Sequence, residues 1–373
     1  MTSVAFSSRA CRVALLGFGT VGSAVARRLT TVERAVPASI QLTHIFDRRA
    51  ALKRASLARA DILWTDRIED VLVGDADVIV EAVGGVDPAA EWIRAALAAG
   101  KSVVTANKQV IARHGASLLA LAARQGRQLR FEAAVGGAMP IVRAIGDGLA
   151  GDRVTRIVAI LNGTTNAVLT RMENTGCSLD EALADARARG YAEADPSADL
   201  DGDDARAKLA ILCALAFGLR VDPSLIPAQT AAMVTAADIA AALRRNAVVR
   251  QIAHAEFDRA ASILTAWVAP IEVPRGSIFA RTLGAQNAAL ITGEYAGEIG
   301  IFGAGAGGDA TAVAILSDIA AIARDQAAIV PAPLLSSDFE LRNEKRGQIS
   351  IFSFEAEAEG SRSDPSFRLL EAV

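Results

Sequence analysis

The stretch that decides the fold is RVALLGFGTVGSAVARRL, residues 12–29. A short apolar run at 13–16 leads into a G-x-G-x-x-G pattern, and apolar residues then recur at helical spacing. The first glycine permits a tight turn, the second lets backbone approach a pyrophosphate, and the third lets the helix pack on the strand. Because the helix N-terminus also offers free N–H groups to phosphate, the pattern favours a dinucleotide site over a plain tight turn.

The next predicted strand, IQLTHIF, ends at Asp47, where an acid can bind a ribose 2′-OH. Arg48 and Arg49 follow at once, and an arginine there can hold a 2′-phosphate instead. The sequence therefore allows both NAD and NADP, and a solvated charge cluster is the alternative for either arginine alone. The cofactor-binding residues predicted from this region are Gly17, Phe18, Gly19, Thr20, Val21, Gly22, Asp47 and Arg48.

Two further segments, ADVIVEAVGG and KSVVTANK, have the valine-rich character of buried strands and alternate with helical segments. This alternation predicts a parallel sheet with helices on both faces, which binds ligands at the carboxyl ends of its strands. Lys108 lies at such an end, which favours a role beside the cofactor over the alternative of a solvated lysine. The next segment, QLRFEAAVGGAMPIV, is predicted to be a strand that carries Glu132 into a Gly-Gly turn.

The second half of the chain has a different pattern of polar and apolar residues. RVTRIVAIL alternates polar and apolar residues, as in an antiparallel strand with one solvated face, and is predicted to end in the polar loop 162–166. Ser178 and Glu181 form a capping box that starts a helix, which Gly190 ends. These elements predict an α+β domain after the parallel sheet.

The acidic stretch at residues 198–208, ADLDGDDARAK, allows three interpretations: a calcium-binding loop, a solvated turn or the polar end of an active site. The calcium reading fails because Gly202 comes too early and the twelfth position is Ala210. Asp204 and Lys208 have the spacing of a helical ion pair. The helix that follows is almost wholly apolar and therefore buried, so its charged first turn is expected to face a cleft.

Composition limits the class of protein. The chain has 373 residues, is 52% hydrophobic and carries a net charge of -3, which suits two globular domains and indicates neither a nucleic-acid nor a membrane partner. Three scattered cysteines form no disulfide framework and no zinc pattern, which favours a reducing, cytoplasmic compartment. No apolar run reaches the length of a membrane span.

With these motifs assembled, the chain resembles a homoserine dehydrogenase over roughly residues 12–325. The resemblance rests on GFGTVGSAV, VVTANKQVIA, NGTTNAVLT and GYAEADPSADLDGDDARAKLAIL, in the family's order, with support from NAALITGEYAGEIGIFGAGAGGDATAVAILSDI. The third and fourth segments are the most specific. The family's glycine loop usually has a proline where this chain has Asp309 or Ala310.

The resemblance implies a role for each matching residue. Lys208 would be the acid–base lysine and Lys108 its partner near the nicotinamide, while Glu193, Asp204 and the Gly190 backbone would hold the substrate. Glu132 with carbonyls of Val135, Gly137 and Met139 would bind a monovalent cation, Na⁺ or K⁺. Gly303 and Gly305 would close the NAD or NADP site.

The chemistry is consistent with that reading. Reducing an aldehyde creates an alkoxide, which a positioned ammonium can stabilise and protonate. An amino-acid substrate brings its own ammonium, which needs carboxylates. The other acids of the stretch, Asp199, Asp201 and Asp203, are expected to serve turn geometry and capping. The predicted reaction is reversible reduction of L-aspartate 4-semialdehyde to L-homoserine, in threonine and methionine biosynthesis. Another amino-acid dehydrogenase, such as one acting on aspartate, and a non-catalytic dinucleotide sensor are the alternatives.

The expected fold class is α/β: a Rossmann-type parallel-sheet domain plus an α+β substrate and dimerisation domain. The first is predicted at residues 1–150, completed by a helix at 310–325, and the second at 151–309. Residues 326–373 are expected to be a short tail with one or two strands and no full regulatory domain. The few charges in ALITGEYAG suggest a sheet that pairs across a two-fold axis, hence a homodimer.

Overall fold

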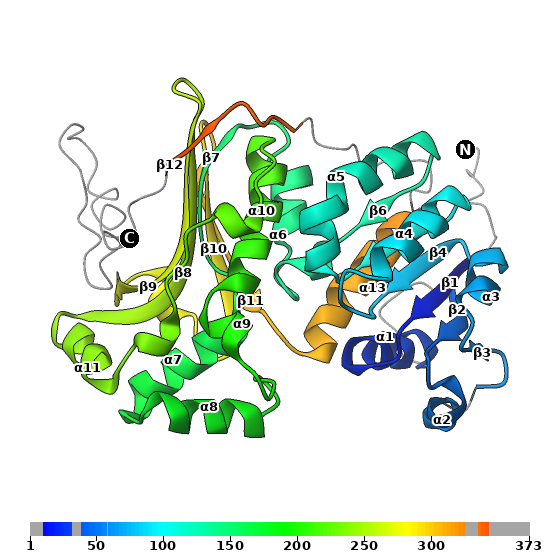
Figure 1. Cartoon of the computed structure of the whole chain (residues 1–373), viewed down its shortest axis with the longest axis horizontal. Coiled ribbons are helices and arrows are strands. Elements are labelled where there is room, and N and C mark those ends of the chain that lie inside the picture. The colour runs from blue at the N-terminus through cyan, green and yellow to red at the C-terminus, as the bar shows by residue number, and fades with distance from the viewer. Residues whose placement is uncertain (1–9, 32–38, 58, 325–334, 343–373) are drawn as a thin grey trace, which may run out of the picture. The chain divides into compact units, whose positions relative to one another are not determined.

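The computed structural model describes residues 10–31, 39–57, 59–324 and 335–342 (Figure 1). The chain divides into two compact units. The first comprises Met1–Ala138 with Gly307–Pro333, and the second comprises Met139–Ala306 with Leu334–Val373. No helix of the described residues is both long and apolar enough to cross a membrane.

The first unit is built on a six-stranded sheet in the order β3-β2-β1-β4-β5-β6, and every described strand pair in it is parallel. The strands are β1 (Cys11–Leu16), β2 (Ile40–Phe46), β3 (Leu63–Thr65), β4 (Val78–Glu81), β5 (Ser102–Thr105) and β6 (Leu129–Arg130). The helices are α1 (Thr20–Thr30), α2 (Ala50–Lys53), α3 (Ile68–Val73), α4 (Ala89–Ala98), α5 (Lys108–Arg124) and α13 (Gly308–Arg324). This is the predicted Rossmann-type arrangement, with a strand order that reverses beside β1.

Two glycines of the motif, Gly17 after β1 and Gly22 in the first turn of α1, are required by their contacts. Gly17 has a φ of +94°, and a Cβ there would lie 2.7 Å from the Ala82 carbonyl oxygen. A Cβ on Gly22 would lie 2.0 Å from the Gly17 carbonyl oxygen. Because both positions exclude a side chain, the strand can turn sharply into a helix that packs close to it.

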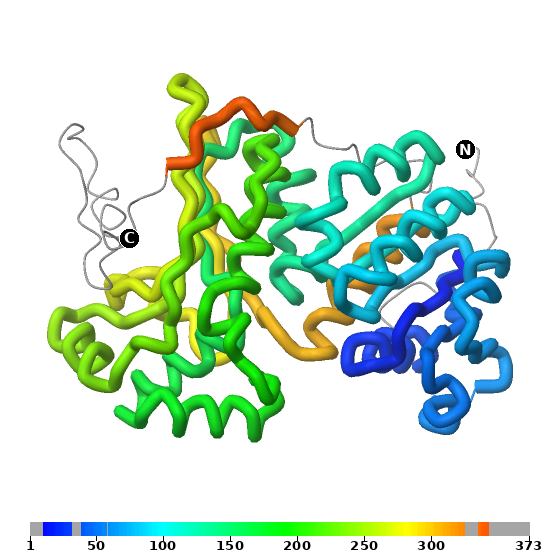
Figure 2. The backbone as a smooth tube through the Cα atoms, in the orientation of Figure 1, coloured from blue at the N-terminus to red at the C-terminus, as the bar shows by residue number. Residues whose placement is uncertain are grey.

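The helix α13 completes the first unit from far along the chain. In Figure 2 its orange trace lies beside the blue trace of α1. Its apolar face, including Ala312, Ile315 and Ile319, belongs to the same buried cluster as Val13 and Val25.

The second unit is built on a mixed six-stranded sheet in the order β11-β10-β7-β8-β9-β12. Its strands are β7 (Val154–Ile160), β8 (Ala247–Asp258), β9 (Ile263–Pro274), β10 (Gln286–Gly293), β11 (Gly297–Ala304) and β12 (Glu340–Arg342). Among the described strand pairs of this second sheet, the β9–β12 pair is parallel and the others are antiparallel. The helices are α6 (Ile141–Arg143), α7 (Gly163–Thr175), α8 (Leu179–Ala188), α9 (Ser197–Leu200), α10 (Asp203–Phe217), α11 (Ala236–Arg244) and α12 (Ile278–Arg281). The predicted α/β fold with a second, α+β part is confirmed.

Two local predictions were wrong, and a third is confirmed in part. The segment around Glu132 is a strand only at Leu129–Arg130, and a short 3₁₀ helix, Glu132–Ala134, follows it. The stretch predicted as a polar loop after β7 is the first turn of α7, because the Asn162 side chain accepts from the Thr165 N–H and caps that helix. Of the predicted tail strands, β12 is present, and the remainder lies outside the described residues.

Candidate active site

Lys208 and Asp204 form a nearly buried ion pair on the first turns of α10. The Lys208 Nζ lies 2.8 Å from the Asp204 Oδ2, and the two side chains are 12% and 10% exposed. The same ammonium donates a hydrogen bond of 2.7 Å to the Leu161 carbonyl, just beyond β7. The helix holds Lys208 in place because its neighbours Ala207 and Leu209 are buried. Such a pair differs from an exposed ion pair, whose contribution to stability is small.

Asn162 joins this pair to a second acid. Its Nδ2 donates to the Asp204 Oδ2 at 2.9 Å and to the Asp199 Oδ1 at 2.7 Å. Asn162 was not predicted as a site residue, and its position at the start of NGTTN was the signal that could have found it. Asp199 was expected to serve turn geometry and capping, and its carboxylate also belongs to this network.

Glu193 and Gly190 lie in the loop between α8 and α9. Gly190 has a φ of +75°, the left-handed conformation in which a helix C-terminus often ends. Glu193 is exposed, and its carboxylate makes no hydrogen bond or ion pair with the described residues. The Thr164 hydroxyl donates to the Tyr191 carbonyl at 2.6 Å, which ties this loop to the first turn of α7.

Gly303 lies near the end of β11, and Gly305 directly follows that strand in the second unit. The Gly305 N–H donates to the Ala285 carbonyl at 3.0 Å. A Cβ on Gly305 would lie 2.2 Å from the Asn287 Oδ1, whereas a Cβ on Gly303 would meet nothing closer than Met139 at 3.5 Å. The packing therefore requires glycine more strictly at position 305 than at position 303.

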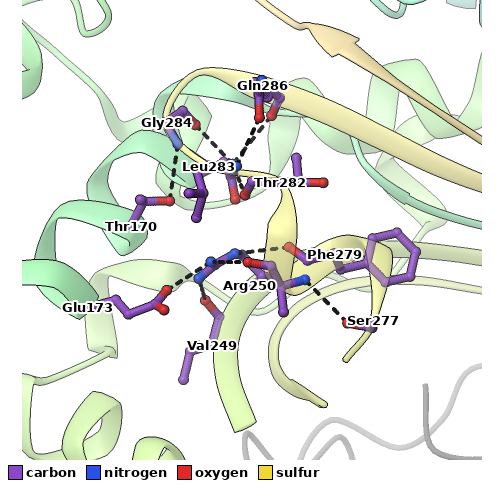
Figure 3. Close-up of polar contacts among 12 residues, drawn as sticks. Thr170, Glu173, Val249, Arg250, Ser277, Phe279, Thr282, Leu283, Gly284 and Gln286 are labelled. Carbon is purple, nitrogen blue, oxygen red and sulfur yellow. Dashed lines mark hydrogen bonds and ion pairs between the residues drawn. The ribbon is translucent and has the colours of Figure 1, made fainter. Parts of the chain in front are cut away.

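A row of polar side chains on α7 holds the segment before β10 (Figure 3). The Asn166 Nδ2 donates to the carbonyls of Thr282, Gly284 and Gln286 at 3.0, 2.9 and 3.3 Å. One turn later, the Thr170 hydroxyl accepts from the Gly284 N–H at 3.3 Å. This segment includes Ala285, so the same helix that Asn162 caps also fixes the partner of Gly305.

The row ends in a buried ion pair. The Glu173 carboxylate lies 2.8 Å from the guanidinium of Arg250, which has no exposed surface (Figure 3). Arg250 also donates to the carbonyls of Val249, Phe279 and Ala280 at 2.8, 3.3 and 3.3 Å. The buried guanidinium is therefore compensated by a carboxylate and by several hydrogen bonds, so we assign the pair a structural role.

The first unit has a pocket of about 450 Å³ beside the turn that follows β1. Its lining includes Gly17, Phe18, Gly19, Phe46, Asp47, Arg48, Arg49, Lys53, Ala82 and Val83. Thr20 and Val21 begin α1 just beyond these residues. The glycine turn, the helix N-terminus and the β2 end thus meet where a dinucleotide binds a doubly wound sheet.

Asp47 is held by several donors. Its Oδ2 accepts from the Phe18 N–H at 2.9 Å and from the Lys53 ammonium at 2.6 Å, and its Oδ1 accepts from the Arg49 N–H at 2.9 Å. Burial raises the pKa of Asp47, but these hydrogen bonds outweigh it and hold the pKa below its usual value. The carboxylate is therefore charged at neutral pH.

Lys108 begins α5 at the carboxyl end of β5. The Asn107 side chain caps this helix by accepting from the Val110 N–H and also donates to the Gly85 carbonyl at 2.6 Å. The cap fixes where α5 starts, and with it the base of the Lys108 side chain.

The four residues predicted to bind a cation belong to both compact units of the chain. Glu132 is buried, and its N–H donates to the Asp318 carboxylate of α13 at 3.0 Å. Val135 and Gly137 follow it in the first unit, whereas Met139 is the first residue of the second. Cation binding stays a prediction.

Two family models cover most of the chain. The NAD-binding domain of homoserine dehydrogenase matches residues 17–132, and the homoserine dehydrogenase domain matches residues 140–320. The chain belongs to the homoserine dehydrogenase family. It is therefore an oxidoreductase, and its first unit carries the NAD(P)-binding domain.

Similar proteins that align with most of this chain are also homoserine dehydrogenases. The homoserine dehydrogenase of Mycobacterium leprae is 39% identical over 350 residues, which are 92% of this chain and 79% of that protein. A homoserine dehydrogenase structure from Thiobacillus denitrificans superposes with a TM-score of 0.80 at 31% identity, covering 90% of this chain and 80% of that one. A hyperthermophilic archaeal homoserine dehydrogenase solved in complex with NADPH has a TM-score of 0.68 at 27% identity, covering 86% and 99%.

Proposed function

We propose that the chain interconverts L-aspartate 4-semialdehyde and L-homoserine with NAD(P), with Lys208 as the acid–base group. The observation that carries the proposal is the Lys208–Asp204 pair held by Leu161 and Asn162. An ammonium has three N–H donors, and two of those on Lys208 are used by these contacts. The third is available for the oxygen of the substrate.

In this mechanism the nicotinamide supplies the hydride when bound, and the residues of the chain handle the proton. During reduction Lys208 donates a proton to the new alkoxide, and during oxidation it accepts one from the hydroxyl of homoserine. Asp204, anchored by Asn162, holds the ammonium in register with the reacting oxygen. Glu193 and the Gly190 backbone, with Asp204, are proposed to receive the amino group of the substrate, and Lys108 to act near the nicotinamide.

The direct test is to mix the purified chain with L-homoserine and NADP⁺ or NAD⁺ and to follow formation of the reduced nicotinamide. Reduction that depends on homoserine supports the proposal. A parallel reaction with L-aspartate tests the alternative dehydrogenase. Turnover of aspartate but not homoserine, or cofactor binding without turnover of either, would refute it.

We further propose that Glu132 with carbonyls of Val135, Gly137 and Met139 binds Na⁺ or K⁺. Glu132 is buried, and its carboxylate together with backbone carbonyls would offer the all-oxygen ligands that hard cations prefer. Activity in sodium or potassium chloride should exceed that in choline chloride at equal ionic strength. Glu132→Gln should remove the difference, and equal rates in all three salts would exclude such a site.

A homodimer is proposed for the second unit. Its edge strand β11 carries Phe302, which is 67% exposed, and the turn before it carries Tyr295, which is 80% exposed. Exposed aromatic residues at an open sheet edge favour pairing with a second copy. Light scattering at micromolar concentration should give twice the chain mass, and a monomer mass would exclude the proposal.

The proposed functional domains are a cofactor domain, residues 1–150 completed by 310–325, and a substrate and dimerisation domain, residues 151–309. A cytoplasmic location is proposed because the three cysteines are free thiols, two of them buried. Fractionation of the source cells would test it.

A further inference from the structure

The acid at the end of β2 has an ammonium in direct contact. Lys53, the last residue of α2, donates to the Asp47 Oδ2 at 2.6 Å and to the Phe18 carbonyl at 2.9 Å. Its side chain is only 22% exposed. Two hydrogen bonds therefore hold this lysine against the carboxylate rather than leaving it in solvent.

This contact bears on which cofactor the pocket accepts. An acid at this place in a doubly wound fold normally binds the ribose 2′-OH, and its charge repels a 2′-phosphate. Here the Lys53 ammonium neutralises Asp47, while the Phe18 and Arg49 amides occupy further acceptor positions on the same carboxylate. The negative charge of Asp47, which would normally select NAD by repelling a 2′-phosphate, is therefore weakened by the Lys53 ammonium of the same protein.

The charge around Asp47 favours an anion. The pocket that it lines carries three positive side chains, Arg48, Arg49 and Lys53, against this single acid. Within the described residues, neither arginine side chain pairs with an acid. Two cations in the pocket thus remain unmatched by protein charge.

The adjoining hollow has the opposite character. It is about 440 Å³ in volume, and Asp66, Glu69 and Asp87 line it together with Arg67 and the shared Arg48. A doubly charged phosphate would meet repulsion among these acids. A 2′-phosphate is therefore expected in the pocket lined by Arg48, Arg49 and Lys53 rather than in the adjoining acidic hollow.

We propose that Lys53 determines cofactor specificity: by neutralising Asp47 it makes this a site for NADP, whose 2′-phosphate binds Arg48 and Arg49. The proposal rests on the dehydrogenase function proposed above. It predicts that the wild-type enzyme prefers NADP⁺ to NAD⁺.

The first test compares Lys53→Met, which keeps the length and loses the charge, with Lys53→Arg, which keeps the charge. In homoserine oxidation, Lys53→Met should lower kcat/KM for NADP⁺ by at least about tenfold more than for NAD⁺, because Asp47 then repels the phosphate. Lys53→Arg should retain most of the preference. Arg54→Met is the matched control, since it removes a neighbouring exposed charge that does not line this pocket.

The second test removes both charges. If Lys53 acts by neutralising Asp47, adding Asp47→Asn to Lys53→Met should recover much of the lost NADP⁺ selectivity. Equal losses for both cofactors in Lys53→Met, no recovery in the double variant, or a wild-type preference for NAD⁺ would each overturn the proposal.

Calorimetry with NADP⁺ and NAD⁺ alone separates this inference from the proposed function. If wild-type protein binds the cofactors but oxidises no homoserine, the proposed function fails. The ratio of the two dissociation constants in wild type and Lys53→Met still decides the role of Lys53, with a ratio unchanged by the substitution overturning it.

Discussion

Substitution of Lys208 tests the mechanism most directly. The side chain has two described partners, Asp204 and Leu161, and its third N–H is assigned to the substrate. Lys208→Ala removes the proton donor and acceptor, so turnover should fall by roughly 10²–10⁴-fold in both directions, the usual range for loss of a general acid–base. The cofactor pocket belongs to the other compact unit, so the dissociation constant for NADP should change little.

Lys208→Arg distinguishes proton transfer from charge stabilisation. A guanidinium preserves the charge and can still pair with Asp204, but it does not lose its proton at ordinary pH. Oxidation of homoserine should therefore stay slow in this variant.

The assay should measure kcat and both KM values for each variant, with circular dichroism and a melting temperature to check folding. Truncation leaves Asp204 with the Asn162 amide as a described partner, which limits the damage to folding. Near-normal turnover in Lys208→Ala would refute the assigned role. A variant that failed only through weaker NADP binding would refute it equally.

Four further substitutions have defined outcomes. Arg48→Ala should weaken NADP more than NAD by roughly 1.5–3 kcal/mol, because only NADP offers it a 2′-phosphate; titration of both cofactors checks this. Gly305→Ala should destabilise the fold by about 1–3 kcal/mol in urea unfolding, since the new carbon would lie 2.2 Å from the amide oxygen of Asn287, while Gly303→Ala should change little. Burial lowers the pKa of His254 from 6.5 to about 4, so the unfolded chain binds the proton first. The contribution of this residue is present above pH 6.5 and falls by up to about 3 kcal/mol toward pH 4, and melting curves of wild type and His254→Asn across that window should converge as pH drops.

The first unit could be predicted closely because its signals are local. The strand, the glycines and the amphipathic helix all lie within residues 12–29, and the clash that excludes a side chain at Gly22 is with the Gly17 carbonyl of the same stretch. The ion pair of Asp204 and Lys208 was likewise visible from its four-residue spacing. Periodicity and spacing report such contacts because they depend on neighbours along the chain.

The contacts that could not be predicted are those between distant segments. Asn162 meets acids 37 and 42 residues away, and nothing in the spacing of NGTTN shows which acids it reaches. Asp47 posed a similar problem, since the sequence shows an acid beside arginines but not which cation touches it. Lys53 takes that place because α2 turns its last residue back toward the β2 end.

The contacts of the Lys208–Asp204 pair with the two residues after β7 explain why two separate motifs must occur together. This strand lies inside the sheet, between β10 and β8, and the two residues directly after it are Leu161 and Asn162. The Leu161 carbonyl accepts from Lys208 while the Asn162 amide donates to Asp204. Successive residues of an extended chain point to opposite sides, so a shift of β7 by one position would exchange an amide donor for an apolar side chain at Asp204. The acids of α10 therefore have a defined geometry only when NGTTN follows an internal strand in this register.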